Sequence, residues 1–362
     1  VTRAGRCAYS ARADYAADIY VPEDYDVASS GEILREDAGN GFDRVRVELK
    51  NACGFGVVVS RKFHVREGQA ASGVKVRAFG QSRGKLSAAR DAAIDALNAL
   101  EPLLGSYSYD ALTIVQAQSV SEMPVGGVLI LSESDWANTD TLRARVTALT
   151  AQVFLSDVVQ VNPGSEAWLI EGASEYLSLL LTEDSEGEAA FAAALDALVR
   201  PALQVTIPGG LSVDSFTNRF ATQREYEIVT RERGAAVMHE LRLLMGRDAF
   251  LNGMRLYARE NRFAQATYRS FAAALPEAFG RDVTDALIHH LYYTQESLLT
   301  RRRGLRTLRR KYFARFDRRQ TRLLPYAQTF RSRLVKRISP ALPEKDMRPK
   351  GATAGIKTRS GR

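Results

Sequence analysis

Residues 168–176 read Trp168-Leu169-Ile170-Glu171-Gly172-Ala173-Ser174-Glu175-Tyr176, an apolar segment that carries two carboxylates. Glu171 and Glu175 are four positions apart, so they share one side of the helix that we predict from Glu166 to Leu181. With Glu166 near the helix start, these carboxylates either bind a hard cation such as calcium or form a solvated face with favourable charge near the N-terminus. We favour the solvated face, because acidic residues at helical spacing are common on helix surfaces.

Further helices are predicted on both sides of this segment. Before it, residues 139–160 place Leu142, Val146, Leu149 and Val153 at spacings of three and four, which make one helical face. A similar face runs from Leu86 to Leu100. After it, the same periodicity predicts helices over residues 188–200, 231–246, 248–260 and 268–293.

The first part of the chain instead alternates polar and apolar residues. Residues 44–49 and 74–79 alternate as half-buried strands do, and shorter strands are expected at residues 18–22, 57–59 and 62–65. A pair of short strands, 112–115 and 128–131, follows the first helix. The order predicts an α+β chain, with a partial all-β N-terminal domain followed by a mainly helical domain.

Charge is distributed unevenly along the chain. The formal net charge is +8, yet residues 301–362 hold 21 basic and 3 acidic residues, against 29 basic and 39 acidic residues in the remainder. An acidic body with a basic tail is different from a uniformly basic, nucleic-acid-binding chain. The tail places Leu305, Leu308, Tyr312 and Phe316 at helical spacing, so it is either an amphipathic segment for anionic surfaces or a solvated tail.

The two cysteines, Cys7 and Cys53, are too few for a disulfide framework or a four-cysteine zinc site. One bridge between them would suit an exported protein. No apolar run is long enough to span a bilayer, and no signal-peptide core follows the first residues. We therefore expect either a cytoplasmic protein or a fragment of an exported one.

In order and spacing, these features resemble the aminopeptidase N family of zinc metallopeptidases, the gluzincins, over about residues 12–293. The resemblance is carried by residues 14–31, 107–115, 168–176 and 233–241. It implies the second half of that family's β domain within residues 1–68 and a thermolysin-like domain at 69–297. The resemblance ends near the tail, and the composition assigns residues 298–362 to an Arg-rich basic tail.

The zinc site of this family needs the motif HExxH, in which two histidines on one helix face bind zinc and the glutamate is the general base. A glutamate 19 residues later is the third ligand, a position that Glu171 fits. Counting back places Ala148-Leu149-Thr150-Ala151-Gln152 where the motif should stand. The resemblance thus implies a degenerate site, in which Ala148, Leu149 and Gln152 replace the two ligands and the base. We expect no bound zinc, because Glu171 alone cannot hold it.

Two other family positions are also altered. The exopeptidase loop, Gly-x-Met-Glu in the family, reads Ser121-Glu122-Met123-Pro124-Val125-Gly126-Gly127 here. Met123, Gly126 and Gly127 remain, but Pro124 replaces the glutamate that holds the substrate amine, and Glu122 is expected to face the opposite side of the strand. The family's transition-state tyrosine corresponds to Arg231, and Tyr226 is out of register.

The sequence contains four histidines, His64, His239, His289 and His290, and no two of them are four positions apart. HExxH is therefore missing in every register. His239-Glu240 begins like a zinc helix, but Leu243 stands at the second ligand position, so we interpret His239 as a residue of a helix with Leu241 and Leu244 in the core. The adjacent His289 and His290 point about 100° apart on a helix and cannot chelate together.

These observations predict an inactive, aminopeptidase N-like protein that binds peptides or acts as a scaffold. A peptide could still pair with the loop strand around residues 118–123. The alternatives are an active zinc metallopeptidase whose ligands come from elsewhere, and a protein that binds membrane or nucleic acid through residues 301–362.

Overall fold

The computed structural model describes residues 10–118, 122–207 and 211–279. Several predicted features lie outside these residues: Cys7, Ser121, the end of the helix predicted over 268–293, His289, His290 and the basic tail. Within the described ranges, no helix is long and apolar enough to cross a membrane.

Two small antiparallel sheets form the N-terminal part. The first contains β1 (Ala13–Pro22), β4 (Phe42–Ala52) and β3 (Glu32–Gly39), in that order, and the second pairs β2 (Asp26–Ser29) with β5 (Val57–Ser60). Val45 and Val47 of β4 alternate with charged neighbours and are fully buried, so one face of the first sheet forms a core.

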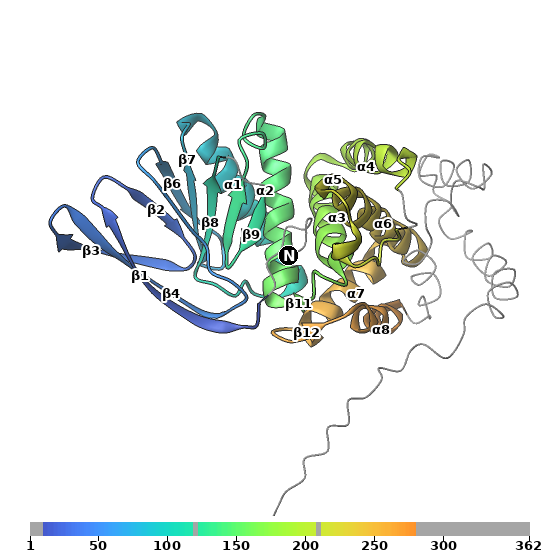
Figure 1. The fold of residues 1–362 in the computed structure, drawn as a ribbon. Coiled ribbons are helices and arrows are strands. Elements are labelled where there is room, and N and C mark those ends of the chain that lie inside the picture. Colours follow the sequence, from blue (N-terminus) through green and yellow to red (C-terminus); the bar gives the residue numbers. More distant parts are fainter. Residues whose placement is uncertain (1–9, 119–121, 208–210, 280–362) are drawn as a thin grey trace, which may run out of the picture. The chain divides into compact units, whose positions relative to one another are not determined.

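A five-stranded sheet follows in the order β6-β7-β8-β10-β9 (Figure 1). Its strands are β6 (His64–Gln69), β7 (Lys75–Gly80), β8 (Ala111–Gln116), β10 (Val128–Leu131) and the edge strand β9 (Met123–Val125). The long helix α1 (Arg83–Leu104) makes the crossover between the parallel strands β7 and β8 and packs on β6 and β7.

Helix α2 (Thr139–Val153) packs against α1 and leads into the helical part. It begins where the Asn138 side chain accepts hydrogen bonds from the Asp140 and Thr141 amides, and it ends in a π-helical turn, η1 (Phe154–Val158). The short parallel pair β11 (Gln160–Val161) and β12 (Gln265–Ala266) then joins the two ends of the helical part.

The helical part comprises α3 (Ala167–Glu186), α4 (Glu188–Gln204), α5 (Gln223–Tyr226), α6 (Arg233–Met245), α7 (Arg247–Glu260) and α8 (Tyr268–Phe279), with a 3₁₀ turn η2 (Thr217–Arg219) and a π-helical turn η3 (Glu227–Glu232). Helices α3 and α6 cross at Gly172 and Gly234. A β-carbon on Gly172 would lie only 2.6 Å from Gly234 Cα, so glycine allows this close approach.

The predicted α+β class is confirmed, and the predicted helices occur within a few residues of their expected ends. The sequence did not predict strands β2 and β3. Residues 32–39 of β3 are mostly exposed and lack a clear alternation of polar and apolar residues. The predicted boundary between residues 68 and 69 falls within β6, which pairs with β7 of the five-stranded sheet.

Candidate functional site

Helices α2 and α3 carry the residues that the sequence resemblance aligns with the zinc ligands of the aminopeptidase N family. Gln152 lies on α2 and Glu171 on α3, and the Gln152 Nε2 amide donates a hydrogen bond of 3.3 Å to Glu171 Oε1. Ala148, one turn before Gln152, is also buried on α2. Gln152 and Glu171, which are 19 positions apart, are thus in hydrogen-bond contact, and Ala148 lies on the same helix as Gln152.

A second donor reaches the same carboxylate. The hydroxyl of Tyr226, at the end of α5, donates a hydrogen bond of 3.0 Å to Glu171 Oε1. Gln152, Glu171 and Tyr226 are each no more than 2% exposed. We call these three residues the Glu171 cluster. A buried carboxylate that accepts two hydrogen bonds is stabilised by roughly 1.5–3 kcal/mol per bond.

A second buried polar group lies two turns earlier on α2. Arg145 binds Glu122 through two bonds, Nε to Oε2 at 2.8 Å and Nη2 to Oε1 at 2.6 Å. Its third nitrogen, Nη1, donates to Glu175 Oε2 at 2.6 Å, and Arg231 Nη1 lies 3.4 Å from Glu122 Oε1. We call Glu122, Arg145, Glu175 and Arg231 the Arg145 network. It joins the loop before β9 to α2, α3 and η3.

The side chains of the Arg145 network are only 7–15% exposed. Burial opposes the charged form of Arg145, but the Glu175 carboxylate beside it outweighs this effect and the pKa of Arg145 is raised. Both carboxylate oxygens of Glu122 accept a hydrogen bond from the Arg145 guanidinium, which is the bidentate geometry of strong arginine–carboxylate pairs.

The structure corrects two expectations about this region. Glu122 does not face away from the site, since it is buried and paired with Arg145. It stands two positions before Pro124, and alternation in an extended chain puts such residues on the same side, so the expectation was wrong. Tyr226 contacts Glu171, although the spacing along a regular helix predicts that it is out of register. The π-helical turn η3 lies between Tyr226 and α6, and it has more residues per turn than an α-helix, so spacing along a regular helix does not hold across it.

Arg231 lies on η3, where it is 3.8 Å from Glu227 and 3.5 Å from Glu232 in addition to Glu122. The sequence does contain a signal for the tyrosine, because Tyr226 is the one tyrosine between Tyr176 and Tyr257. Spacing measured along an ideal helix could not reveal it.

The remnant of the exopeptidase loop is the edge strand β9 and its turn. Gly126 and Gly127 have φ values of 53° and 78°, the conformation of a two-residue turn that joins Val125 to Val128. The next pair, Pro124 and Leu129, then has its backbone groups directed outward on β9. Proline has no N–H, so the open edge of β9 lacks a donor at this position.

Other candidate ligands lie elsewhere. His239 is buried on α6, with Nδ1 2.9 Å from the Tyr176 hydroxyl, and burial together with Arg242 lowers its pKa to about 3. Leu241 is buried and Leu244 partly buried in the core, as expected. Glu166 accepts a hydrogen bond of 2.9 Å from the Tyr268 amide and is not part of the Arg145 network.

The three carboxylates proposed as a calcium site therefore have separate partners. In the part of the chain that the structure describes, no three acidic, histidine or cysteine side chains are grouped as metal ligands. The residues around Glu171 do not fit zinc, since Ala148 offers no donor atom and the Gln152 amide directs its N–H toward the carboxylate.

Comparison with known proteins agrees with this architecture. Residues 151–290 match the family model described as "Peptidase family M1 domain", which confirms the predicted resemblance over that segment. No curated protein matches the chain in sequence.

Among solved structures, the chain resembles an M1 zinc metallopeptidase from Deinococcus radiodurans, with a TM-score of 0.64 and 17% identity over 77% of this chain and 64% of that one. A mutant of that metallopeptidase gives the same TM-score at 16% identity, over the same shares of the two chains. A two-domain M1 zinc metallopeptidase mutant bound to L-arginine gives 0.63 at 16% identity, over 78% of this chain and 64% of that one. This chain thus spans about 64% of the length of the structures it resembles.

Proposed function

We propose that this M1-type chain is a metallopeptidase-like protein that does not hydrolyse peptides through zinc and has kept the fold for binding or scaffolding. The observation that carries the proposal is the contact of Gln152 and Tyr226 with the same oxygen of Glu171. Neutral donors thus surround the carboxylate at the third-ligand position, where a metal peptidase needs a cation held by further ligands.

The chemistry of peptide hydrolysis at such a site also needs a base. At such a site a zinc ion would activate a water molecule, and a neighbouring carboxylate would accept the proton that this water loses. Leu149 stands at the position of that base and is buried in the core, so it can neither accept a proton nor bind water. The side chains at this site therefore support no hydrolytic step.

Of the two retained roles, the structure favours a scaffold over a peptide-binding cleft. Strand addition along β9 would require outward backbone donors, and Pro124 removes one of them. Glu122, the carboxylate nearest to the loop, is engaged by Arg145 and Arg231.

Zinc titration of the purified chain by calorimetry, combined with elemental analysis, tests the proposal. We expect no stoichiometric zinc, and hydrolysis of aminoacyl nitroanilides at the background rate with or without a chelator. As a positive control, the triple variant Ala148→His, Leu149→Glu, Gln152→His restores the missing motif beside Glu171 and should bind zinc measurably. Tight zinc in the parent chain, or chelator-sensitive trimming that Glu171→Gln abolishes, would refute the proposal and support an active peptidase.

Association with anionic membranes or nucleic acid through residues 301–362 stays a prediction. Salt-sensitive binding to phosphatidylserine vesicles or to RNA, lost when these residues are removed, would support it. Binding that survives the truncation would contradict it.

A further inference from the structure

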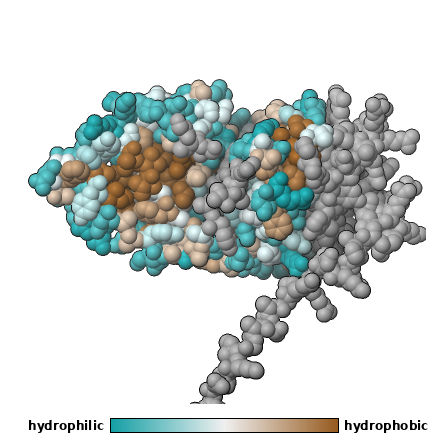
Figure 2. Space-filling model, in the orientation of Figure 1, coloured by the Kyte–Doolittle hydropathy of each residue, from teal (hydrophilic) through white to brown (hydrophobic). Residues whose placement is uncertain are grey.

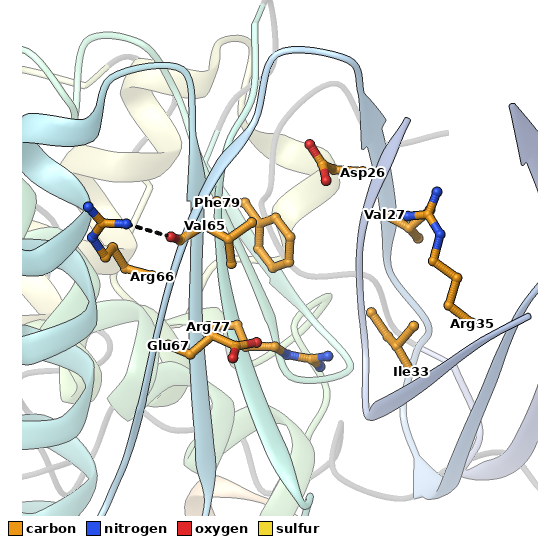
Figure 3. Close-up of a pocket in the computed structure, with 9 residues that line it drawn as sticks. All are labelled: Asp26, Val27, Ile33, Arg35, Val65, Arg66, Glu67, Arg77 and Phe79. Atoms are coloured by element: carbon orange, nitrogen blue, oxygen red, sulfur yellow. Dashed lines mark hydrogen bonds between the residues drawn. The ribbon is translucent and has the colours of Figure 1, made fainter. Parts of the chain in front are cut away.

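A groove in the N-terminal half of the described chain lies outside the site above. It has a volume of about 570 Å³ and opens between the face of β6 and β7 on one side and strands β2 and β3 on the other (Figure 3). None of its lining residues belongs to the Glu171 cluster or the Arg145 network.

The pairing register explains why apolar side chains line this groove. Val65 of β6 is opposite Phe79 of β7, and Glu67 is opposite Arg77, so these four side chains share one face of the sheet. Helix α1 packs on these two strands from the opposite face, where Gly68 lies against Ile94 and Arg90. The facing wall contributes Val27 and Ile33, so both walls are apolar at their centres.

Strand β6 is an edge strand, and its open side faces outward beside the groove. The turn after β6 closes with the Ala70 amide donating to the Val74 carbonyl, 2.9 Å away. In an antiparallel pair, hydrogen-bonded residue pairs alternate with pairs whose N–H and C=O groups point outward. Since Ala70 bonds to Val74, the pairs Glu67–Arg77 and Val65–Phe79 are of the second kind, and the backbone groups of Val65 and Glu67 point away from β7.

Side chains already occupy the outward carbonyls but not the outward amides. Arg66 Nη1 donates to the Val65 carbonyl at 3.1 Å, as Figure 3 shows, and Arg90 Nη1 donates to the Glu67 carbonyl at 3.3 Å. Within the described residues, no side chain accepts a hydrogen bond from the Val65 or Glu67 amide. The edge thus offers N–H donors, which an extended backbone with free carbonyls would satisfy.

Arg77 gives the groove a charge preference. Its Nη2 donates to the Gly31 carbonyl, while its buried Nε has no hydrogen-bond partner among the residues that the structure describes. Burial lowers the pKa of Arg77, although Glu67 and Glu32 lie near enough to oppose this effect. A desolvated guanidinium with an unused donor favours a carboxylate in the groove.

The rim is apolar as well. Val57 and Val59 of β5 are 36% and 44% exposed, and Val59 is the cross-strand partner of Val27 in the groove wall. Figure 2 shows an apolar patch on the strand-rich half of the molecule. Large apolar side chains exposed beside an open strand edge are typical of surfaces that bind another chain.

We propose that this groove binds an extended segment of a partner protein, which adds to the free edge of β6 as a strand and places an acidic side chain near Arg77. Apolar residues two positions before and after the acidic one would pack against the partly exposed Val65 on one wall and Ile33 on the other, whereas Phe79 and Val27 are only 5% exposed. The proposal is independent of the missing zinc chemistry, and it gives the scaffold role a binding surface.

The test uses a fluorescent peptide, acetyl-Thr-Val-Thr-Glu-Thr-Val-Thr-amide, in which the two valines and the glutamate share one face of the strand, and an analogue with lysine in place of glutamate. Fluorescence anisotropy on the full chain should show that the acidic peptide binds about tenfold more tightly, the effect of roughly one charge-assisted hydrogen bond. Arg77→Met should remove this preference, because it removes the cation and keeps the length of the side chain.

Val65→Pro deletes one outward N–H without breaking a bond to β7, whereas Val65→Thr keeps the amide and the branched shape. We expect the proline variant to weaken binding about tenfold and the threonine variant to stay near the parent. Ile33→Asp on the facing wall supplies a second, independent loss if the proline variant melts early. Peptide binding no tighter than millimolar, equal binding by the proline variant, or a dimer of this chain that the same substitutions dissolve would each overturn the proposal.

Discussion

The Glu171 cluster and the Arg145 network both include residues of α2 and α3, yet they stabilise buried carboxylates in different ways. Glu171 accepts its hydrogen bonds from an amide and a hydroxyl, which carry no charge, although it lies near enough to Arg145 to help raise the pKa of that guanidinium. Glu122 and Glu175 share the positive charge of Arg145, and Arg231 adds a second one 3.4 Å from Glu122. Removing one partner should therefore lower the free energy of unfolding much more in the Arg145 network than in the Glu171 cluster.

The largest effect is expected for Arg145→Met. This substitution removes the guanidinium that both Glu122 and Glu175 contact, so we expect the free energy of unfolding in urea to fall by about 3–5 kcal/mol at neutral pH. The loss should shrink in acid, where the two carboxylates can take up protons. Arg145→Lys keeps the positive charge but loses the two parallel hydrogen bonds of the guanidinium, so its stability should lie between those of the parent and of Arg145→Met. A loss below about 1 kcal/mol for Arg145→Met would contradict a buried ionic network.

A substitution at the crossing of α3 and α6 should disturb both groups together, because α3 carries Glu171 and Glu175. In Gly172→Ala, the new methyl group would meet the Gly234 backbone at 2.6 Å, so we expect a loss of about 1–3 kcal/mol on denaturation. Gly84→Ala is the matched control on α1, since its methyl group would meet nothing within 4 Å. That variant should be neutral or slightly more stable, and equal losses for the two variants would exclude the helix contact as the cause.

The neutral group should respond more weakly. Tyr226→Phe and Gln152→Leu each remove one donor to Glu171 and leave the other, so we expect each to cost about 1–2 kcal/mol. In a Glu171→Gln background both losses should become smaller, which a double-mutant cycle measures directly. Additive losses would show that the two donors do not act through Glu171.

The smallest effect is a pH dependence from Glu166, which has one backbone donor where Glu171 has two side-chain donors. Burial raises the pKa of Glu166 from 4.5 to about 7, against the opposing bond from the Tyr268 amide. The native state therefore holds a proton that the unfolded chain releases near pH 4.5, so stability should fall as the pH rises from about 4.5 to about 7.

Because Glu166 is partly solvated, this contribution should be on the order of 1–2 kcal/mol. Glu166→Gln keeps an acceptor for the Tyr268 amide and should flatten the difference across that pH window. An identical slope in denaturation curves of both proteins would assign the pH dependence to other groups.

Apolar periodicity predicted most of the fold, because helix faces repeat every three or four residues whatever they pack against. It failed where packing and local geometry decide the structure. The exposed strand β3 has no clear alternation, and the π-helical turn η3 rotates Tyr226 into the site by an amount that regular spacing does not predict. The sequence did not predict a role for Arg145, since no pattern near it indicates that Glu122, 23 residues earlier, is its partner.

The sequence alone determines that the chain has no HExxH motif, because no two of its four histidines are four positions apart, and folding cannot change that spacing. Which groups surround Glu171 instead could not be judged in that way. Gln152 and Tyr226 come from positions 19 residues before and 55 residues after it, and only the packing of α2, α3 and α5 aims both at one oxygen atom. Ligand identity is a local property of the sequence, whereas the solvation of a buried charge depends on contacts between distant segments.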